Sequence, residues 1–390
     1  MENWKTVRLG DVCEILNGYA FKSDKYVDSG IRVIRITNVQ KGFIEDNSPA
    51  FYPITEKENL KDYELYENDL LISLTGNVGR VALLSKEMLP AALNQRVGCI
   101  RIRDKNLLIS YLFTFLNSDK FESDCIYSAR GIAQKNMSTE WLKNYLIPLP
   151  PIEVQIKIAN NLNTCAKIIK KHNKQLNNFD LLIKSRFIEM FGDNPIENGK
   201  WKVEKLGNLG LCKNGMNFSY EDNGFEINCL GVGDFKDNAV ISNCEKLPVI
   251  SLNEKPSEEY LLKDNDIVFV RSNGNKELVG RSVLVHPRVL TTFSGFCIRF
   301  RLSTDSINHL FLLQFLKMPN TRKNMAGRGA NIQNLNQQIL SNLDIPVPPI
   351  ELQNDFAAFV QQIDKSKFAV QKSLEKAETL YKSLMQEYFG

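Results

Sequence analysis

Apolar residues in the two halves of the chain form short runs that alternate with polar turns. Runs rich in β-branched residues and bounded by Gly, Asn or Asp predict strands at 31–36, 70–74 and 97–102. Denser apolar runs at 107–116 and 307–316 predict short buried helices. Because strands and helices mix within each half, both globular parts are predicted to be α+β.

A different period begins after two proline pairs, Pro150-Pro151 and Pro348-Pro349. Proline fixes φ and disfavours the helical region for its predecessor, so each pair ends the preceding pattern. Apolar residues then recur in steps of four and three, which predicts two heptad seams on helices of about 35 to 40 residues. The seam residues are Leu162, Cys165, Ile169, Leu176, Phe179, Ile183 and Met190, then Phe356, Val360, Ile363, Val370, Leu374, Ala377, Tyr381, Leu384 and Tyr388.

A single long helix with an exposed apolar seam is unstable in water. We therefore expect the two seams to bury each other in an antiparallel coiled coil, with one globular domain near each end. His172, Arg186 and Lys367 interrupt the seams, which would weaken the pairing but could fix its register. The alternative is that each helix packs onto another protein and the two never meet.

The second half of the chain repeats the first at an offset of about 197 to 201 residues. In the strongest match, IPLPPIEVQ at 147–155 and IPVPPIELQ at 345–353 share seven of nine residues. Further matches join Trp4-Lys5 to Trp201-Lys202, Asn17-Gly18 to Asn214-Gly215, Asn68-Asp69 to Asn265-Asp266, Val78-Gly79-Arg80 to Val279-Gly280-Arg281, Cys99-Ile100-Arg101 to Cys297-Ile298-Arg299, and Arg130-Gly131 to Arg328-Gly329. The predicted fold is therefore an α+β duplication, with two similar α/β globules at 1–146 and 199–344, a hinge and central helix at 147–198, and a hinge and C-terminal helix at 345–390.

Composition removes several classes of protein from consideration. No run approaches the roughly 18 apolar residues of a membrane span, and the first ten residues lack a signal-peptide core, so we expect a cytoplasmic protein without a membrane partner. Eight scattered cysteines and three isolated histidines predict reduced thiols and no metal site. The chain also lacks a complete amino-methyltransferase motif, nucleotide-binding motif or nuclease constellation, so we expect no catalysis and no bound cofactor.

The net charge of +4 is too small to predict nucleic-acid binding, so any DNA contact has to be local. Two stretches, 125–139 and 306–343, contain no Asp or Glu but several residues suited to phosphates and base edges. The candidates there are Arg130, Gln134, Lys135 and Asn136, then Lys317, Arg322, Lys323, Arg328, Asn331, Gln333 and Asn334.

A second pair of candidate loops follows the Asn-Asp strands. Their side chains differ between the copies while the flanking residues agree, as two readers of different sequences would require. Asn and Gly are also ordinary turn residues, so a purely structural role is the alternative. The candidates are Thr75, Asn77 and Arg80, then Arg271, Ser272, Asn273, Lys276 and Arg281, with Tyr19 and Lys22 added from the matched Asn-Gly opening.

The order of front domain, Pro-Pro hinge and long helix, occurring twice, resembles the DNA-specificity subunits of type I restriction-modification systems. The resemblance covers essentially the whole chain and includes the opening 17–23 and the Arg130-Gly131 loop. It implies two target recognition domains, each reading one half of a bipartite, asymmetric site in double-stranded DNA, with the helices setting the gap between the halves. It also implies two methyltransferase subunits and, in the full complex, two restriction subunits as partners. S-adenosylmethionine, ATP and magnesium would bind only to those partners.

Two other functions stay open at this point. The first is a duplicated DNA-binding adaptor or regulator that acts without methyltransferase partners. The second is a coiled-coil scaffold with no nucleic-acid ligand.

Overall fold

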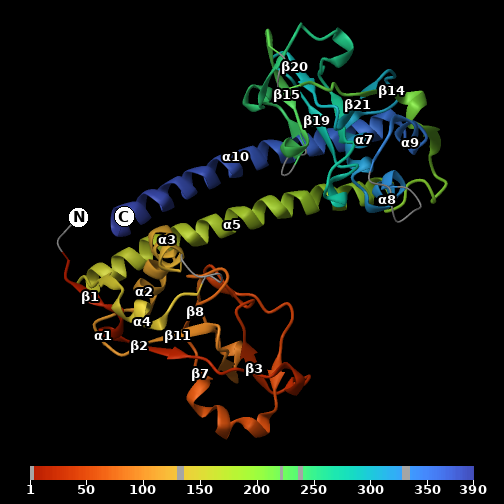
Figure 1. Cartoon of the computed structure of the whole chain (residues 1–390). Helices are drawn as coiled ribbons and strands as arrows, with labels where there is room; N and C mark the ends of the chain where they lie inside the picture. Colours follow the sequence, from red (N-terminus) through yellow and green to blue (C-terminus); the bar gives the residue numbers. More distant parts are fainter. Residues whose placement is uncertain (1–3, 130–135, 220–222, 236–239, 327–333) are drawn as a thin grey trace. The chain divides into compact units, whose positions relative to one another are not determined.

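The computed structural model describes residues 4–129, 136–219, 223–235, 240–326 and 334–390 (Figure 1). The chain divides into two compact units, which are unit 1, Met1–Asn173 with Lys372–Gly390, and unit 2, Lys174–Gln371. There are two long helices, α5 (Ile152–Phe191) and α10 (Ile350–Phe389). Each contributes one segment to unit 1 and another to unit 2. The predicted duplication of an α+β domain followed by a long helix is confirmed.

The front domain of unit 1 is built on one antiparallel sheet and one mixed sheet. The first sheet has the antiparallel order β2-β11-β8-β9. The second has the order β6-β3-β10-β7, with β10 parallel to β3. Their bounds are β2 Cys13–Asn17, β3 Ile31–Ile34, β6 Phe51–Tyr52, β7 Glu64–Leu65, β8 Leu70–Ser73, β9 Val81–Leu83, β10 Ala91–Leu93 and β11 Val97–Ile102. The three predicted strands are confirmed as β3, β8 and β11, the first two ending slightly earlier than expected.

The front domain of unit 2 repeats this arrangement. One sheet has the order β14-β21-β18-β19-β16 and the other the order β17-β15-β20, with β20 parallel to β15. Their bounds are β14 Gly210–Asn214, β15 Phe225–Leu230, β16 Val240–Ile241, β17 Val249–Leu252, β18 Asp266–Val270, β19 Ser282–Val285, β20 Thr291–Phe293 and β21 Cys297–Leu302. The predicted helices are confirmed as α2 (Ile109–Leu116) and α7 (His309–Leu316).

The buried carboxylate of each Asn-Asp pair holds an arginine in the same way in both domains. Asp69 accepts a hydrogen bond from Arg101 Nε at 2.8 Å. Asp266 is fully buried and accepts one from Arg301 Nε at 2.7 Å. Arg101 and Arg301 are therefore equivalent residues.

This equivalence corrects one match made from the sequence. Arg101 and Arg301 are 301 − 101 = 200 residues apart, so pairing Cys99-Ile100-Arg101 with Cys297-Ile298-Arg299 is wrong by two residues. The strand ladders agree, because β2 ends opposite Gly98 and β14 ends opposite Ile298. Hydrogen bonding fixes the register, whereas the repeated Cys-Ile-Arg letters do not.

The last residue of each hinge motif is a buried glutamine that makes the same hydrogen bonds in both units. Gln155 is fully buried; its Oε1 accepts from Leu108 N at 2.9 Å and its Nε2 donates to Pro150 O at 2.8 Å. Gln353 repeats this, accepting from Asn308 N at 2.8 Å and donating to the Pro348 carbonyl at 2.7 Å. Each glutamine thus fastens the start of a long helix to the segment before α2 or α7.

Within unit 1, the beginning of α5 lies beside the end of α10. Asn161 Nδ2 donates to Tyr388 Oη at 3.1 Å, and Ile158, Leu162 and Phe389 share the core of the front domain. The two segments run in opposite directions, as the seams predicted.

Within unit 2, the end of α5 lies beside the beginning of α10. The rings of Phe187 and Phe356 have centroids 5.4 Å apart. Lys367, which interrupts the seam, forms an ion pair with Asp180 of the other helix. The seams therefore bury each other within each unit, and the alternative that the two helices never meet is excluded.

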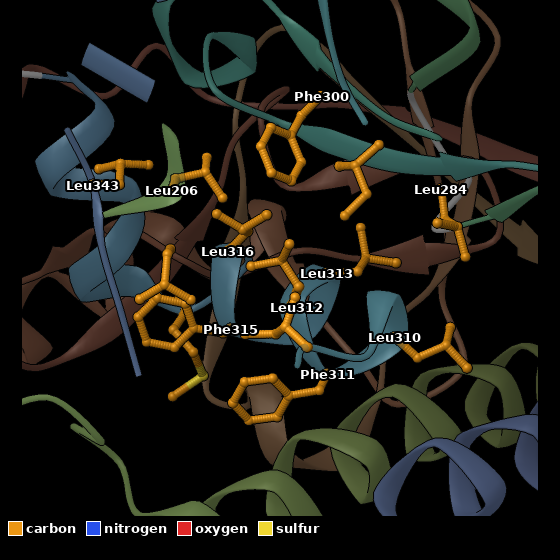
Figure 2. Packing of buried hydrophobic residues seen from close by; sticks show 14 of the residues in the cluster. Leu206, Leu284, Phe300, Leu310, Phe311, Leu312, Leu313, Phe315, Leu316 and Leu343 are labelled. Carbon is orange, nitrogen blue, oxygen red and sulfur yellow. The ribbon is translucent and has the colours of Figure 1, made fainter. Parts of the chain in front are cut away.

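The core of unit 2 joins the front domain to these helix segments through α7. Figure 2 shows Phe311 and Phe315 among the apolar side chains of α7, with Phe300 of β21 across from them. The Phe311 ring stacks on Phe187 of α5 at a centroid distance of 5.5 Å. Burying such aromatic side chains supplies much of the stabilisation of the junction.

Among the described residues, every helix is too short or too polar to cross a bilayer.

Candidate nucleic-acid interface

In both front domains, the loop after the Asn-Asp strand is bound to the end of the acid-free stretch. In unit 1, Thr75 forms a β-bridge with Asn136, and Met137 N donates to Leu74 O at 2.8 Å. In unit 2, Ser272 forms the corresponding bridge with Asn334. The two sets of candidates, chosen separately from the sequence, are therefore neighbours in each domain.

A third segment, the loop between the last two strands, joins the same place. Leu74 N donates to Arg96 O at 3.0 Å in unit 1, and Arg271 N donates to Phe296 O at 2.8 Å in unit 2. Arg96 and Phe296 were not among the residues predicted from the sequence. The duplication carried the signal, but the misaligned Cys-Ile-Arg match hid the correspondence of these two residues.

The Asn-Gly opening is the fourth segment, and its glycine lies very close to the backbone of the third. A Cβ on Gly18 would lie 2.2 Å from the carbonyl of Asn94, and a Cβ on Gly215 would lie 2.1 Å from Ser294 O. No side chain fits such distances, so glycine is required for the opening to pass the third loop. We call the four segments the loop cluster: 17–19, 74–77, 94–96 and 136–137 in unit 1, and 214–216, 271–274, 294–296 and 334–335 in unit 2.

Tyr19 and Lys22 lie at and near the cluster of unit 1. The Tyr19 ring packs against Phe21 at 5.1 Å and Tyr63 at 5.2 Å while 38% of the residue stays exposed. Lys22 is exposed just before a short 3-10 helix. Tyr19 thus has a packing role and also an accessible edge.

The exposed candidates in the cluster are polar and uncharged. Asn77, Asn136 and Asn334 are exposed, while Thr75, Ser272 and Asn273 are half-buried. Asn and Gln amides can bind adenine edges, and Ser or Thr hydroxyls can bind either bases or phosphates.

Several predicted basic candidates donate hydrogen bonds within their own domain. Arg80 donates to the Gln40 side chain, and Arg281 Nη1 to Phe235 O at 3.4 Å. Arg322 Nη2 donates to Glu277 O at 2.7 Å, and Arg271 Nη1 to Gly295 O at 3.3 Å. These arginines brace loops of the domain.

Two lysines of unit 2 lie in different surroundings. Lys317 lines a 310 Å³ cavity, where burial and the nearby Lys367 lower its pKa to about 8. Lys323 of α8 (Pro319–Ala326) is exposed at a separate, mostly polar hollow. Neither belongs to the loop cluster as defined.

The remaining candidates lie outside the described residues. They are Arg130, Gln134, Lys135, Arg328, Asn331 and Gln333, and the same applies to the side chain of Lys276.

The described part of the chain shows no group of three or more His, Cys, Asp or Glu side chains able to hold a metal ion. All eight cysteines are free, and burial raises the pKa of several of their thiols, including that of Cys13 to about 12. A thiol with a raised pKa is a poor nucleophile at neutral pH. The buried thiols with a raised pKa are therefore unsuited to nucleophilic chemistry at neutral pH.

Comparison with known proteins gives a consistent result. The family model described as type I restriction modification DNA specificity domain matches residues 1–178 and again 198–378. The StySPI specificity subunit, a type I restriction enzyme specificity subunit of Salmonella potsdam, is 24% identical over 412 residues, which cover 99% of this chain and 87% of the relative. The corresponding MjaVIII subunit of Methanocaldococcus jannaschii is 24% identical over 412 residues, covering 98% and 91%.

A solved structure has the same fold. The crystal structure of a type I restriction-modification system S subunit from M. genitalium matches with a TM-score of 0.62 at 15% identity, covering 100% of this chain and 96% of that one. At this identity the similarity establishes the arrangement of the backbone alone.

Proposed function

Because the chain belongs to the family of type I restriction-modification DNA specificity proteins, we propose that each front domain reads one half of a bipartite DNA site through its loop cluster. The chain is a specificity subunit and is not itself an enzyme. The observation that supports the proposal is the pair of loop clusters, which have the same backbone bonds but different exposed side chains. Two such clusters suit two different half-sites, because base-edge contacts depend on the side chain.

We further propose that methyltransferase subunits dock on the long helices. Leu182 in unit 2 and Leu380 in unit 1 are 380 − 182 = 198 residues apart, and they are 46% and 52% exposed. Matched apolar side chains on the two units suit two copies of one partner. Two restriction subunits would complete the assembly, and S-adenosylmethionine, ATP and magnesium would bind to these partners.

Co-expression with a methyltransferase subunit tests the assembly. We expect a stable complex with two methyltransferase copies, and Leu182→Glu or Leu380→Glu should each remove one copy. Asn177→Glu is the control, because a residue five positions from Leu182 lies about 140° round the helix. A chain that binds a defined DNA sequence without any methyltransferase would favour the adaptor or regulator. A chain that shows no salt-dependent shift on duplex DNA would favour the scaffold.

The helices would set the gap between the half-sites. Four extra residues, inserted in α5 and in α10 where each passes between the units, lengthen the helices by roughly 6 Å. That length is close to two base-pair steps of about 3.4 Å. Methylation mapping should then show a wider gap and unchanged half-sites, whereas altered half-sites with the old gap would refute this role.

A further inference from the structure

The loops that contain Arg96 and Phe296 have the same backbone bonding in both domains. Each residue's carbonyl accepts from the loop after the Asn-Asp strand, at 3.0 Å for Arg96 and 2.8 Å for Phe296. Each residue's N–H also donates to a side chain two positions earlier, Asn94 Oδ1 or Ser294 Oγ, at 3.3 Å in both cases. The position is therefore held by its backbone, independently of the side chain it bears.

That side chain is also directed into solvent in both domains. Phe296 is 62% exposed, and its ring has no aromatic partner among the described residues. Arg96 is exposed, and its guanidinium forms no hydrogen bond or ion pair with the part of the chain that the structure describes. Both side chains are therefore accessible to a ligand that binds at the loop cluster.

We infer that Arg96 and Phe296 are specificity-determining residues, each for the half-site read by its own domain. This inference rests on the proposed function and extends it to individual residues. The Arg96 guanidinium can donate two hydrogen bonds to the O6 and N7 of a guanine in the major groove. Phe296 offers an apolar contact, which in the major groove selects the methyl group of thymine. Equivalent backbone positions thus carry a charged side chain in unit 1 and an apolar side chain in unit 2.

Neighbouring groups support the assignment to base edges. Asn77 and Asn136 lie in the cluster of unit 1, and Asn273 and Asn334 lie in that of unit 2. Amide side chains beside one guanidinium or one phenyl ring are the residue types that read base pairs. Two arginines of the loops after the Asn-Asp strands, Arg80 and Arg271, donate to Gln40 and to the Gly295 carbonyl, whereas Arg96 has no such partner among the described residues.

The test uses the full chain in complex with its methyltransferase subunit, expressed in a host without such a system. Genome sequencing then maps the methylated sites for Arg96→Ala and Phe296→Ala. Matched controls lie at the opposite ends of the same strands: Arg103→Ala, beyond β11, and Leu290→Ala, before β20, both of exposed side chains. Because backbone atoms hold the loops, all four variants should assemble like the wild type.

We expect Arg96→Ala to lower methylation at the original sites by about 10-fold and to relax the requirement for one guanine in one half-site. Phe296→Ala should relax one thymine in the other half-site, with the first half-site unchanged. The two controls should keep the original pattern.

Three results would overturn the inference. Patterns identical to those of the controls would show that neither side chain reads DNA, while leaving the proposed function intact. Failure of either alanine variant to bind the methyltransferase would assign the position to protein contact. A wild-type complex that methylates no defined bipartite sequence would refute the proposed function and the inference together.

Discussion

The two front domains share their polar framework but differ in the side chains set on it. Both hold an arginine on a buried Asp, both fasten a helix with a buried Gln, and both pass a glycine beneath the third loop. At the position where β11 of unit 1 has the fully buried Cys99, β21 of unit 2 has Arg299, only 5% exposed. Backbone bonding thus preserves the duplicated fold while side chains diverge, even inside the core.

The junction with the helix segments is packed differently in the two units. In unit 2, Phe187 is fully buried against Phe191, Phe311 and Phe356. The residue 198 positions later in unit 1 is Met385, which is only half-buried. Phe187→Ala should therefore lower the free energy of unfolding by about 3–5 kcal/mol, the usual cost of deleting a buried ring.

Met385→Ala is the matched control and should cost clearly less, because a half-buried side chain loses less apolar contact. Chemical unfolding of the full chain, with each unit followed separately by hydrogen exchange, measures both. Equal losses from the two variants would show that the aromatic junction gives unit 2 no additional stability.

The sequence predicted the elements well because their signals are local. Proline pairs, heptad spacing and β-branched runs placed the hinges, the helices and the strands β3, β8 and β11. The repeated Asn-Gly and Asn-Asp pairs also have structural reasons. The two glycines pass close to a backbone carbonyl, and Asn68 and Asn265 adopt a positive φ. The fold could therefore be predicted almost entirely from residue patterns.

The candidate site could be predicted only in part, because it depends on which loops meet. Thr75 and Asn136 are 61 residues apart in the sequence, and only the strand pairing brings them together. Arg80 was predicted as a DNA contact, and nothing in its local pattern indicates that its side chain also donates to Gln40 of a distant hairpin. Arg96 went unnoticed since an exposed arginine in a turn has no pattern of its own.

Removing the carboxylate of the shared Asp–Arg pair should lower the free energy of unfolding equally in the two domains. Asp69 and Asp266 are 4% and 0% exposed, while Arg101 and Arg301 are partly exposed. Removing the carboxylate leaves a partly buried cation unpaired, so Asp69→Asn and Asp266→Asn should each cost about 2–3 kcal/mol. Thermal denaturation of the full chain measures the loss.

Glu14→Gln is the control for this prediction, because its partner Arg103 is mostly exposed and surface pairs contribute about 0–1 kcal/mol. A large loss from only one of the two Asp variants would mean that the pair is structural in one domain and redundant in the other.

Unit 2 has Arg299 at the position where unit 1 has Cys99. We expect this buried arginine to make unit 2 less stable than an apolar residue would. Arg299 Nε and Nη1 are buried without a hydrogen-bond partner among the described residues, and burial lowers the pKa of the guanidinium. Arg299→Met should therefore raise the free energy of unfolding by about 1–2 kcal/mol, since it removes an unsatisfied buried cation. Arg301→Met, which breaks the ion pair beside it, should lower that energy, and a loss of stability in both variants would contradict this account.

The smallest difference concerns the residues after α2 and α7, Asn117 and Lys317. Burial, with Lys367 nearby, lowers the Lys317 pKa from 10.5 to about 8. Between these values the unfolded chain binds the proton and the folded chain does not, so the contribution of Lys317 to stability rises with pH from about 8 to about 10.5. Below pH 8 the lysine is charged in both states, and its desolvation cost is fully present.

Lys317→Asn, which installs the residue of unit 1, should thus stabilise the chain at pH 7 by about 1 kcal/mol, because the lysine is only half-buried and solvent reduces the cost. The gain over the wild type should shrink as the pH approaches 10.5. The other charged groups that line the cavity, Asp180, Lys184, Asp364 and Lys367, are present in both proteins. Denaturant unfolding at several pH values measures it, with exposed Lys323→Asn as the control. A gain independent of pH would show that the substitution acts through packing, and that the charge on Lys317 has no part in the difference between the two units.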